Sequence, residues 1–71
     1  MDKMTMKNKD LENAVGYMAE EFEGIERSKW LHDNTEDPEL KIIYAEIHKD
    51  ERSHAKALLD YMNKKAAVIL K

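Results

Sequence analysis

Apolar side chains recur every three or four residues along two long segments of the chain. This spacing places them on one side of an α-helix, so both segments are predicted to be amphipathic helices. A period of about 3.5 residues, kept over this length, favours coiled-coil-like packing of the two helices. The first apolar stripe consists of Leu11, Val15, Met18, Phe22 and Ile25, with Ala14 beside it. The second stripe runs through Leu40, Tyr44, Ile47, Glu51, His54, Leu58 and Tyr61, with Ile43 and Met62 at its edges.

The segment between the two stripes carries residues that favour helix ends and turns. Residues 33–37 read Asp-Asn-Thr-Glu-Asp, and Asn and Asp are typical turn residues. Asp37 before Pro38 is typical of an N-cap followed by the first helical residue. We therefore predict a first helix over about 9–32, a loop over 33–37 and a second helix over about 38–65. Because the loop is short, residues 1–71 should form a single all-α domain, an antiparallel two-helix hairpin.

A hairpin of this size leaves much of both stripes in water. Two helices cover only one side of each other. A lone core in a chain of 71 residues without cysteine contributes little stability. A two-fold dimer of hairpins, with four helices around one core, is the simplest remedy. We expect a homodimer or a higher homo-oligomer built as a four-helix bundle.

Composition and charge narrow the classes of function. The chain has 12 Lys and Arg against 15 Asp and Glu, a formal net charge of -3, and no cysteine for a disulfide or a thiolate zinc site. The lack of a basic cluster argues against a nucleic-acid partner. No apolar run approaches the roughly 20 residues of a membrane-spanning helix, and the first residues lack the apolar core of a signal peptide. We expect a cytoplasmic location, or a compartment filled from the cytoplasm.

Two ionisable residues interrupt the apolar stripe of the second helix. Glu51 and His54 lie in its middle, with Ile47 and Leu58 on either side. Burying an unpaired charge costs several kcal/mol, so something must compensate for it. Glu51 and His54 also form a Glu-x-x-His spacing, which directs both side chains the same way from adjacent helical turns. A carboxylate oxygen and an imidazole nitrogen placed in this way can bind one cation.

A carboxylate from the first helix would complete such a site. If the hairpin folds near 34–37, residues 51–54 lie level with about 17–20. Glu21 is close to that level and lies beside the apolar stripe, whereas Glu26 is more than a turn nearer the loop. We therefore choose Glu21 as the third ligand. The candidates compared were Glu20, Glu21, Glu23 and Glu26.

A two-fold axis doubles this set of ligands. Two chains would bring four carboxylates and two imidazoles, from Glu21, Glu51 and His54, into one bundle core. Without cations these carboxylates would repel one another strongly. A mixture of carboxylate and imidazole suits Fe, Mn or Zn. A Glu from each of two helices with Glu-x-x-His from each of two others is the ligand set of ferritin-like di-metal carboxylate bundles.

Several short runs resemble the two-helix ferritin-like family, particularly the encapsulated ferritins. The runs are Glu21-Phe22-Glu23, Glu39-Leu40 and Asp50-Glu51-Arg52-Ser53-His54-Ala55, and the resemblance covers about residues 18–64. In that family each chain is half of a ferritin bundle, and dimers build a di-iron ferroxidase centre at their interface. The resemblance places the metal ligands on Glu21, Glu51 and His54. It also matches Glu23 to an acidic residue that helps to admit metal.

The resemblance implies a function. The chain would oxidise Fe²⁺ to Fe³⁺ at an intersubunit centre, for iron storage or detoxification, with two iron ions per dimer. Mn and Zn are the alternative metals, and no catalytic residue beyond the ligands is expected. An encapsulin-type shell is the implied container, although the family's aromatic pair would fall on Arg27 and Ser28 in this chain.

Two other interpretations stay open. In the first, the chain is a dimerising interaction module in which a buried pair of Glu51 and His54 fixes the register of the helices. In the second, the metal is kept and the chemistry changes, either to a rubrerythrin-like peroxidase or to a structural Zn or Mn site. The other histidines are expected to have simpler roles: His32 meets the C-terminal end of the first helix, and His48 lies on the surface.

Overall fold

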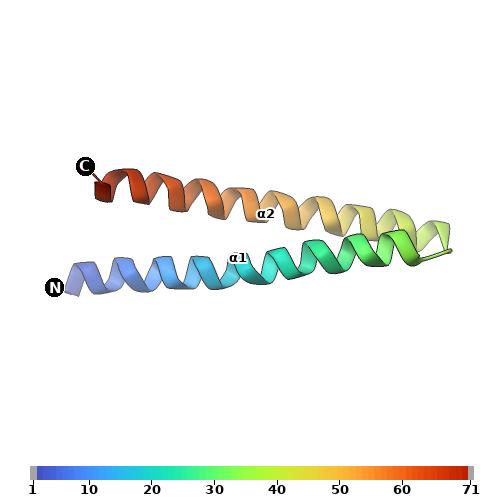
Figure 1. The fold of residues 1–71 in the computed structure, drawn as a ribbon, viewed down its shortest axis with the longest axis horizontal. Helices are drawn as coiled ribbons and strands as arrows, with labels where there is room; N and C mark the ends of the chain where they lie inside the picture. Colours follow the sequence, from blue (N-terminus) through green and yellow to red (C-terminus); the bar gives the residue numbers. More distant parts are fainter. Residues whose placement is uncertain (1, 71) are drawn as a thin grey trace.

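The structure is a computed structural model that describes the backbone of residues 2–70 and the side chains of residues 9–65. It contains two α-helices that lie antiparallel and side by side, with the chain ends at the end away from the loop (Figure 1). Helix α1 spans Asp2–Asn34 and helix α2 spans Pro38–Leu70. Over the described backbone every residue outside the 35–37 loop is helical. The predicted all-α two-helix hairpin is confirmed.

Both helices are longer than the sequence pattern predicts. Helix α1 begins at Asp2 rather than near residue 9, and α2 continues to Leu70 rather than ending near residue 65. Helix α1 also extends into the expected loop, to Asn34. There the Asn34 side-chain Nδ2 donates to the Trp30 carbonyl (2.7 Å), and the Thr35 backbone N–H donates to the Leu31 carbonyl (2.9 Å). These bonds satisfy carbonyls that the end of a helix would otherwise leave free, so only residues 35–37 connect the helices.

The start of α2 has the cap that its sequence predicts. The Asp37 carboxylate accepts hydrogen bonds from the backbone N–H groups of Glu39 (2.9 Å) and Leu40 (3.3 Å). Pro38, which has no N–H to satisfy, is the first residue of the helix. The Asp37 N–H in turn donates to Thr35 Oγ1 (3.2 Å), which holds the short loop in place. The predicted N-cap is therefore confirmed.

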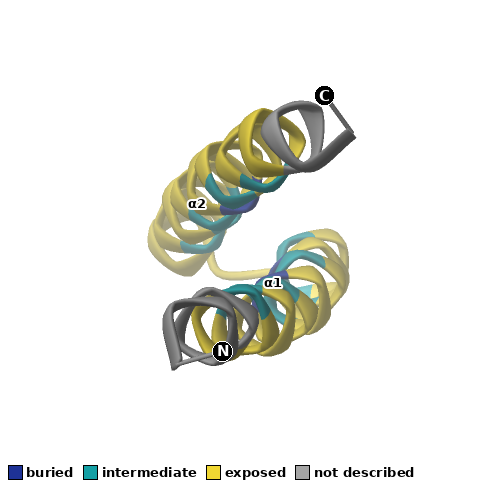
Figure 2. Cartoon of the chain, turned by 90° about the vertical axis from the view of Figure 1, so that its left-hand side faces the viewer, coloured by how far each residue is buried: buried dark blue, intermediate teal, exposed yellow. Residues whose placement is uncertain are grey.

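The helices meet along a surface, here called the seam, on which the buried and half-buried residues lie (Figure 2). Along each helix these seam positions recur at alternating spacings of three and four residues, which is a seven-residue repeat. A seven-residue repeat is the pattern of helices that coil gently around each other. On α1 the buried and half-buried residues of this repeat are Leu11, Ala14, Met18, Glu21, Ile25, Ser28 and His32, and Gly24 and Leu31, also half-buried, lie beside it. On α2 they are Tyr44, His48, Glu51, Ala55, Leu58 and Met62.

The seam is rotated away from the predicted apolar stripes on both helices. Val15 and Phe22 of α1 and Ile47 and Tyr61 of α2, which the pattern places in the core of a four-helix dimer, are exposed in the single hairpin. Among the described side chains the buried residues are Ala55, Glu21 and Ser28. The small residues Ser28 and Ala55 are the most buried of the seam together with Glu21, and several of the bulky apolar residues are turned outward. A single chain therefore encloses almost no apolar core.

The hairpin exposes far more surface than a compact protein of its mass. A compact monomer of this size would expose about 4,600 Å², whereas this chain exposes 6192 Å² and measures 54 × 18 × 13 Å. The exposed large apolar residues are Val15, Tyr17, Phe22, Trp30, Leu40, Ile42, Ile43, Ile47, Leu59 and Tyr61. Within the described range, neither helix has an apolar stretch long enough to cross a bilayer.

Candidate metal centre

Glu21 is the most buried ionisable residue of the described part of the hairpin. Its side chain is only 10% exposed, and its Oε1 lies 3.5 Å from Nδ1 of His54 on the opposite helix. This contact places Glu21 at the level of His54. With Glu51 beside Gly24, residues 51–54 lie level with about 21–24, one helical turn nearer the loop than the predicted 17–20. The imidazole of His54 is 61% exposed, so it lies between the buried carboxylate and the surface.

Glu51 reaches the same region from the other helix, next to a glycine. Its carboxylate fills the space that Gly24 leaves by having no side chain. A Cβ added to Gly24 would collide with Glu51 Oε2 and would lie 2.6 Å from its Cδ. Gly24 follows Glu21 by nearly one helical turn, so Glu51 meets α1 about one turn from Glu21. The chain therefore places both Glu21 and Glu51 between the helices.

Both carboxylates have an oxygen that no protein group satisfies. Glu21 Oε2 and Glu51 Oε1 are buried and have no hydrogen-bond partner. An orphaned carboxylate oxygen in a protein interior is costly, because it has lost its water and gained nothing in return. A divalent cation would supply what is missing. The donor set of two carboxylates and one imidazole fits Fe, Mn or Zn.

One chain does not complete such a centre. Among the residues with described side chains, no three carboxylate or imidazole groups stand close enough together to hold one metal ion. Glu21, Glu51 and His54 thus form an incomplete set, and its imidazole member faces outward. Their metal-ligand roles remain predictions.

The structure separates Glu23 from this set. Glu23 is exposed. It follows Glu21 by two residues, so the two side chains are about 200° apart around the helix axis. Glu20 and Glu26 are exposed as well, in agreement with the choice of Glu21. The role of Glu23 in admitting metal remains a prediction, and it would act from the outer face of α1.

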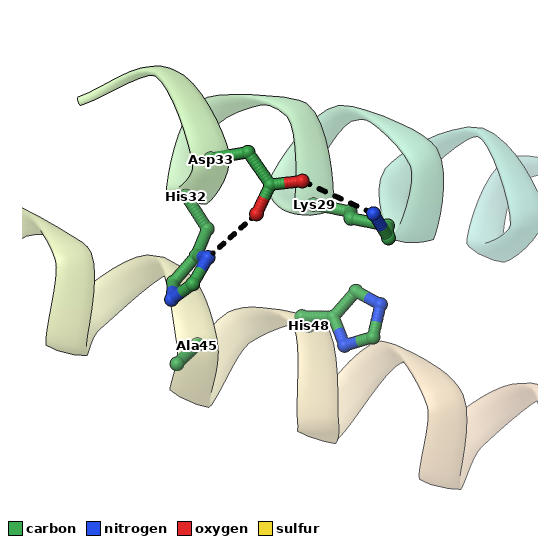
Figure 3. Close-up of a pocket in the computed structure, with 5 residues that line it drawn as sticks. All are labelled: Lys29, His32, Asp33, Ala45 and His48. Carbon is green, nitrogen blue, oxygen red and sulfur yellow. Dashed lines mark hydrogen bonds and ion pairs between the residues drawn. The ribbon is translucent and has the colours of Figure 1, made fainter.

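A second group of ionisable residues lies nearer the loop, around a cavity of about 270 Å³ (Figure 3). It is lined by Lys29, His32, Asp33, Ala45 and His48. The Asp33 carboxylate lies 3.0 Å from His32 Nδ1 and 3.0 Å from Lys29 Nζ. The hydrogen bond with His32, followed by that with Lys29, holds the pKa of Asp33 below its ordinary value.

The position of His48 in this cavity differs from the prediction. His48 was expected on the surface, but it is half-buried at the seam. The rotation of α2 turns it inward together with Ala55 and Met62, which follow it at intervals of seven residues. That spacing of small and apolar residues is the sequence signal that could have indicated its position.

Known proteins provide no further guidance on this arrangement. No protein-family model, no curated protein and no solved structure matches the chain.

Proposed function

We propose that this chain is a ferritin-like di-iron protein that oxidises Fe²⁺ to Fe³⁺ at a centre shared by two copies. One observation carries the proposal: Glu21 and Glu51 each bury a carboxylate oxygen without a partner, beside the outward-facing imidazole of His54. Ionised groups are retained in such positions when they serve a function that offsets their cost in stability.

Charge balance supports two metal ions per dimer. Two copies carry four carboxylates from Glu21 and Glu51, and two divalent cations neutralise them. In a weakly solvated interior, this neutralisation removes the repulsion between the carboxylates. The imidazole of His54 adds a nitrogen ligand from each copy, which favours a transition metal over Ca²⁺ or Mg²⁺.

The position of the set along the hairpin supports a two-fold dimer. His54 is the central residue of α2, and Glu21 lies within a turn of the centre of α1. A two-fold axis perpendicular to the helices at this level would bring the two sets together. The two hairpins would then overlap along their whole length, with their loops at opposite ends. The large exposed surface of a single chain favours this arrangement.

The chemistry needs few protein groups beyond the ligands. Two Fe²⁺ ions each give one electron to dioxygen, which takes up two protons and leaves as hydrogen peroxide. Glu21 and Glu51 hold the metal in both oxidation states, because carboxylates stabilise the more highly charged Fe³⁺. A dimer encloses no mineral, so storage requires a larger assembly or an encapsulin-type shell that receives the Fe³⁺.

Iron binding and oxidation test the proposal directly. We expect the wild-type protein to bind two Fe²⁺ per dimer and to oxidise them in air, followed by the ultraviolet absorbance of Fe³⁺. Glu21→Gln and Glu51→Gln should each slow the oxidation at least tenfold. Glu20→Gln, which changes the exposed neighbour in the same way, should behave like the wild type.

Each other outcome identifies a different function. If both ligand variants match the wild type in iron content and rate, the proposed centre is wrong. Oxidation by hydrogen peroxide and not by dioxygen would indicate a peroxidase. A protein that binds no metal and whose oligomeric state is lost or changed in Glu51→Gln would be an interaction module held in register by the pair of Glu51 and His54.

A further inference from the structure

The two sides of the seam are distinct surfaces. In a seven-residue repeat, the positions just before and just after the seam residues lie on opposite sides of the seam. Gly24 and Lys29 occupy these two positions on α1, and His54 and Ala45 occupy them on α2. Because Lys29 and Ala45 line one cavity, they share a side, and Gly24 and His54 share the other. The Gly24 flank consists of Tyr17, Gly24, Leu31, Leu40, Ile47, His54 and Tyr61. The Lys29 flank consists of Val15, Phe22, Lys29, Ala45, Arg52 and Leu59.

The apolar stripes of the two helices therefore point to different flanks. The bulky residues Val15 and Phe22 of α1 face the Lys29 flank, whereas Ile47 and Tyr61 of α2 face the Gly24 flank. A second hairpin that packs against this one can cover one flank and leaves the other in water. The sequence pattern does not indicate which flank is covered, because it treats both stripes as parts of one core.

Charge distinguishes the flanks. Apart from His54, no residue of the Gly24 flank can carry a charge. The Lys29 flank contains Lys29 and Arg52, and Lys49 and Lys56 lie beside Arg52 on α2. Lys29 and Lys56 are paired with Asp33 and Asp60. Covering this charged surface would remove these pairs and the Arg52 guanidinium from water, which is costly. On the Gly24 flank the charges brought together are those of the ligand carboxylates, which two metal ions would neutralise.

We propose that a second copy of this chain docks on the Gly24 flank, and that Gly24 is the opening through which Glu51 faces that copy. The inference rests on the proposed function and names the surface that completes its centre. At Gly24 no side chain separates the Glu51 carboxylate from this flank, and the exposed imidazole of His54 lies on it. Docking on the Lys29 flank would leave the width of the helices between the two sets of ligands.

The available surface is sufficient for a stable dimer. A standard interface buries about 800 Å² on each partner. The chain exposes 6192 Å², which is about 1,600 Å² more than a compact protein of its mass. The apolar residues Leu40, Ile47 and Tyr61, each about two-fifths exposed, lie along α2 on the Gly24 flank, with His54 between Ile47 and Tyr61.

Matched substitutions on the two flanks test the assignment. Ile47 is 42% exposed and Phe22 is 51% exposed, so Ile47→Lys and Phe22→Lys place the same charge at similar depths on opposite sides. Lysine is a good helix former, so both variants should keep their helical circular dichroism. Tyr61→Lys and Leu59→Lys form a second pair, in case one variant fails to fold.

We expect Ile47→Lys to raise the dimer dissociation constant, measured by sedimentation equilibrium with Co²⁺ present, at least tenfold. Phe22→Lys should change it less than threefold. The assignment would be overturned if Phe22→Lys weakened the dimer more than Ile47→Lys did, or if both variants weakened it equally. It would also be overturned if the wild-type protein stayed monomeric. Co²⁺ absorbance, recorded on the same samples, separates this inference from the proposed function. A dimer that binds no Co²⁺ and dissociates in Ile47→Lys would support docking on the Gly24 flank but refute the proposed metal centre. A dimer that binds Co²⁺ and dissociates only in Phe22→Lys would support the metal centre but refute docking on the Gly24 flank.

Discussion

The two glycines of α1 provide a matched test of how Glu51 is placed. Neither has a positive φ, so both Gly16 and Gly24 accept alanine without backbone strain. A Cβ at Gly16 would have no atom within 4 Å, whereas a Cβ at Gly24 would meet the Glu51 carboxylate. The same chemical change therefore meets open space at one position and a candidate metal ligand at the other.

The expected effects on stability and on metal affinity have opposite signs. Replacing a helix-interior glycine by alanine stabilises by about 0.5–1 kcal/mol, and Gly16→Ala should show this gain. At Gly24 the displaced group is the end of a flexible side chain. Moving the Glu51 carboxylate into water relieves its desolvation, so metal-free Gly24→Ala should be at least as stable as Gly16→Ala. The metal affinity of Gly24→Ala should fall by about 10–100-fold, which is the usual loss when the residues that orient a metal ligand are changed.

Urea denaturation in the presence of a chelator measures the first effect, and Co²⁺ titration at a fixed protein concentration measures the second. Adding Glu51→Asp to Gly24→Ala shortens the carboxylate by one methylene, which makes room for the new Cβ. This double variant should recover part of the lost affinity. Equal Co²⁺ affinity in Gly16→Ala and Gly24→Ala would refute the argument that Gly24 holds the Glu51 ligand in place.

Two further predictions concern the helix ends near the loop. Asp37→Ala removes the acceptor of two backbone N–H groups at the start of α2 and should destabilise the protein by about 0.5–2 kcal/mol in chemical denaturation. The neighbouring exposed Glu36→Ala should have little effect, and equal losses would contradict the cap. The lowered pKa of Asp33 predicts a contribution to stability that is present above the unfolded-chain pKa and disappears as the pH falls through the folded pKa. The wild type should therefore lose stability relative to Asp33→Asn on acidification below about pH 4, and a difference independent of pH would contradict the pairing with His32 and Lys29.

The local features of this fold follow from short-range chemistry, so the sequence alone could predict them. Helix-favouring residues, the turn at 35–37 and the Asp37 cap each depend on neighbours in the chain. The common direction of Glu51 and His54 follows from their spacing on one helix. The level of Glu21 follows from the position of the loop, because an antiparallel hairpin pairs residues equally distant from its turn.

The sequence pattern did not indicate which residues of each stripe would face the other helix of the same chain. Periodicity fixes the angles between residues of one helix but not the rotation of that helix about its own axis. In this hairpin the rotation is set by close approach at Gly24, Ser28 and Ala55, which turns Phe22 and Ile47 outward.

The sequence by itself thus determined two helices, their antiparallel order and the choice of Glu21, Glu51 and His54 as candidate ligands. Only the tertiary structure decided that each carboxylate has one buried oxygen without a partner, and that the predicted apolar stripes of the two helices face opposite flanks. These features depend on contacts between residues far apart in the chain. Such contacts arise from the fit of two helical surfaces rather than from the pattern of either helix.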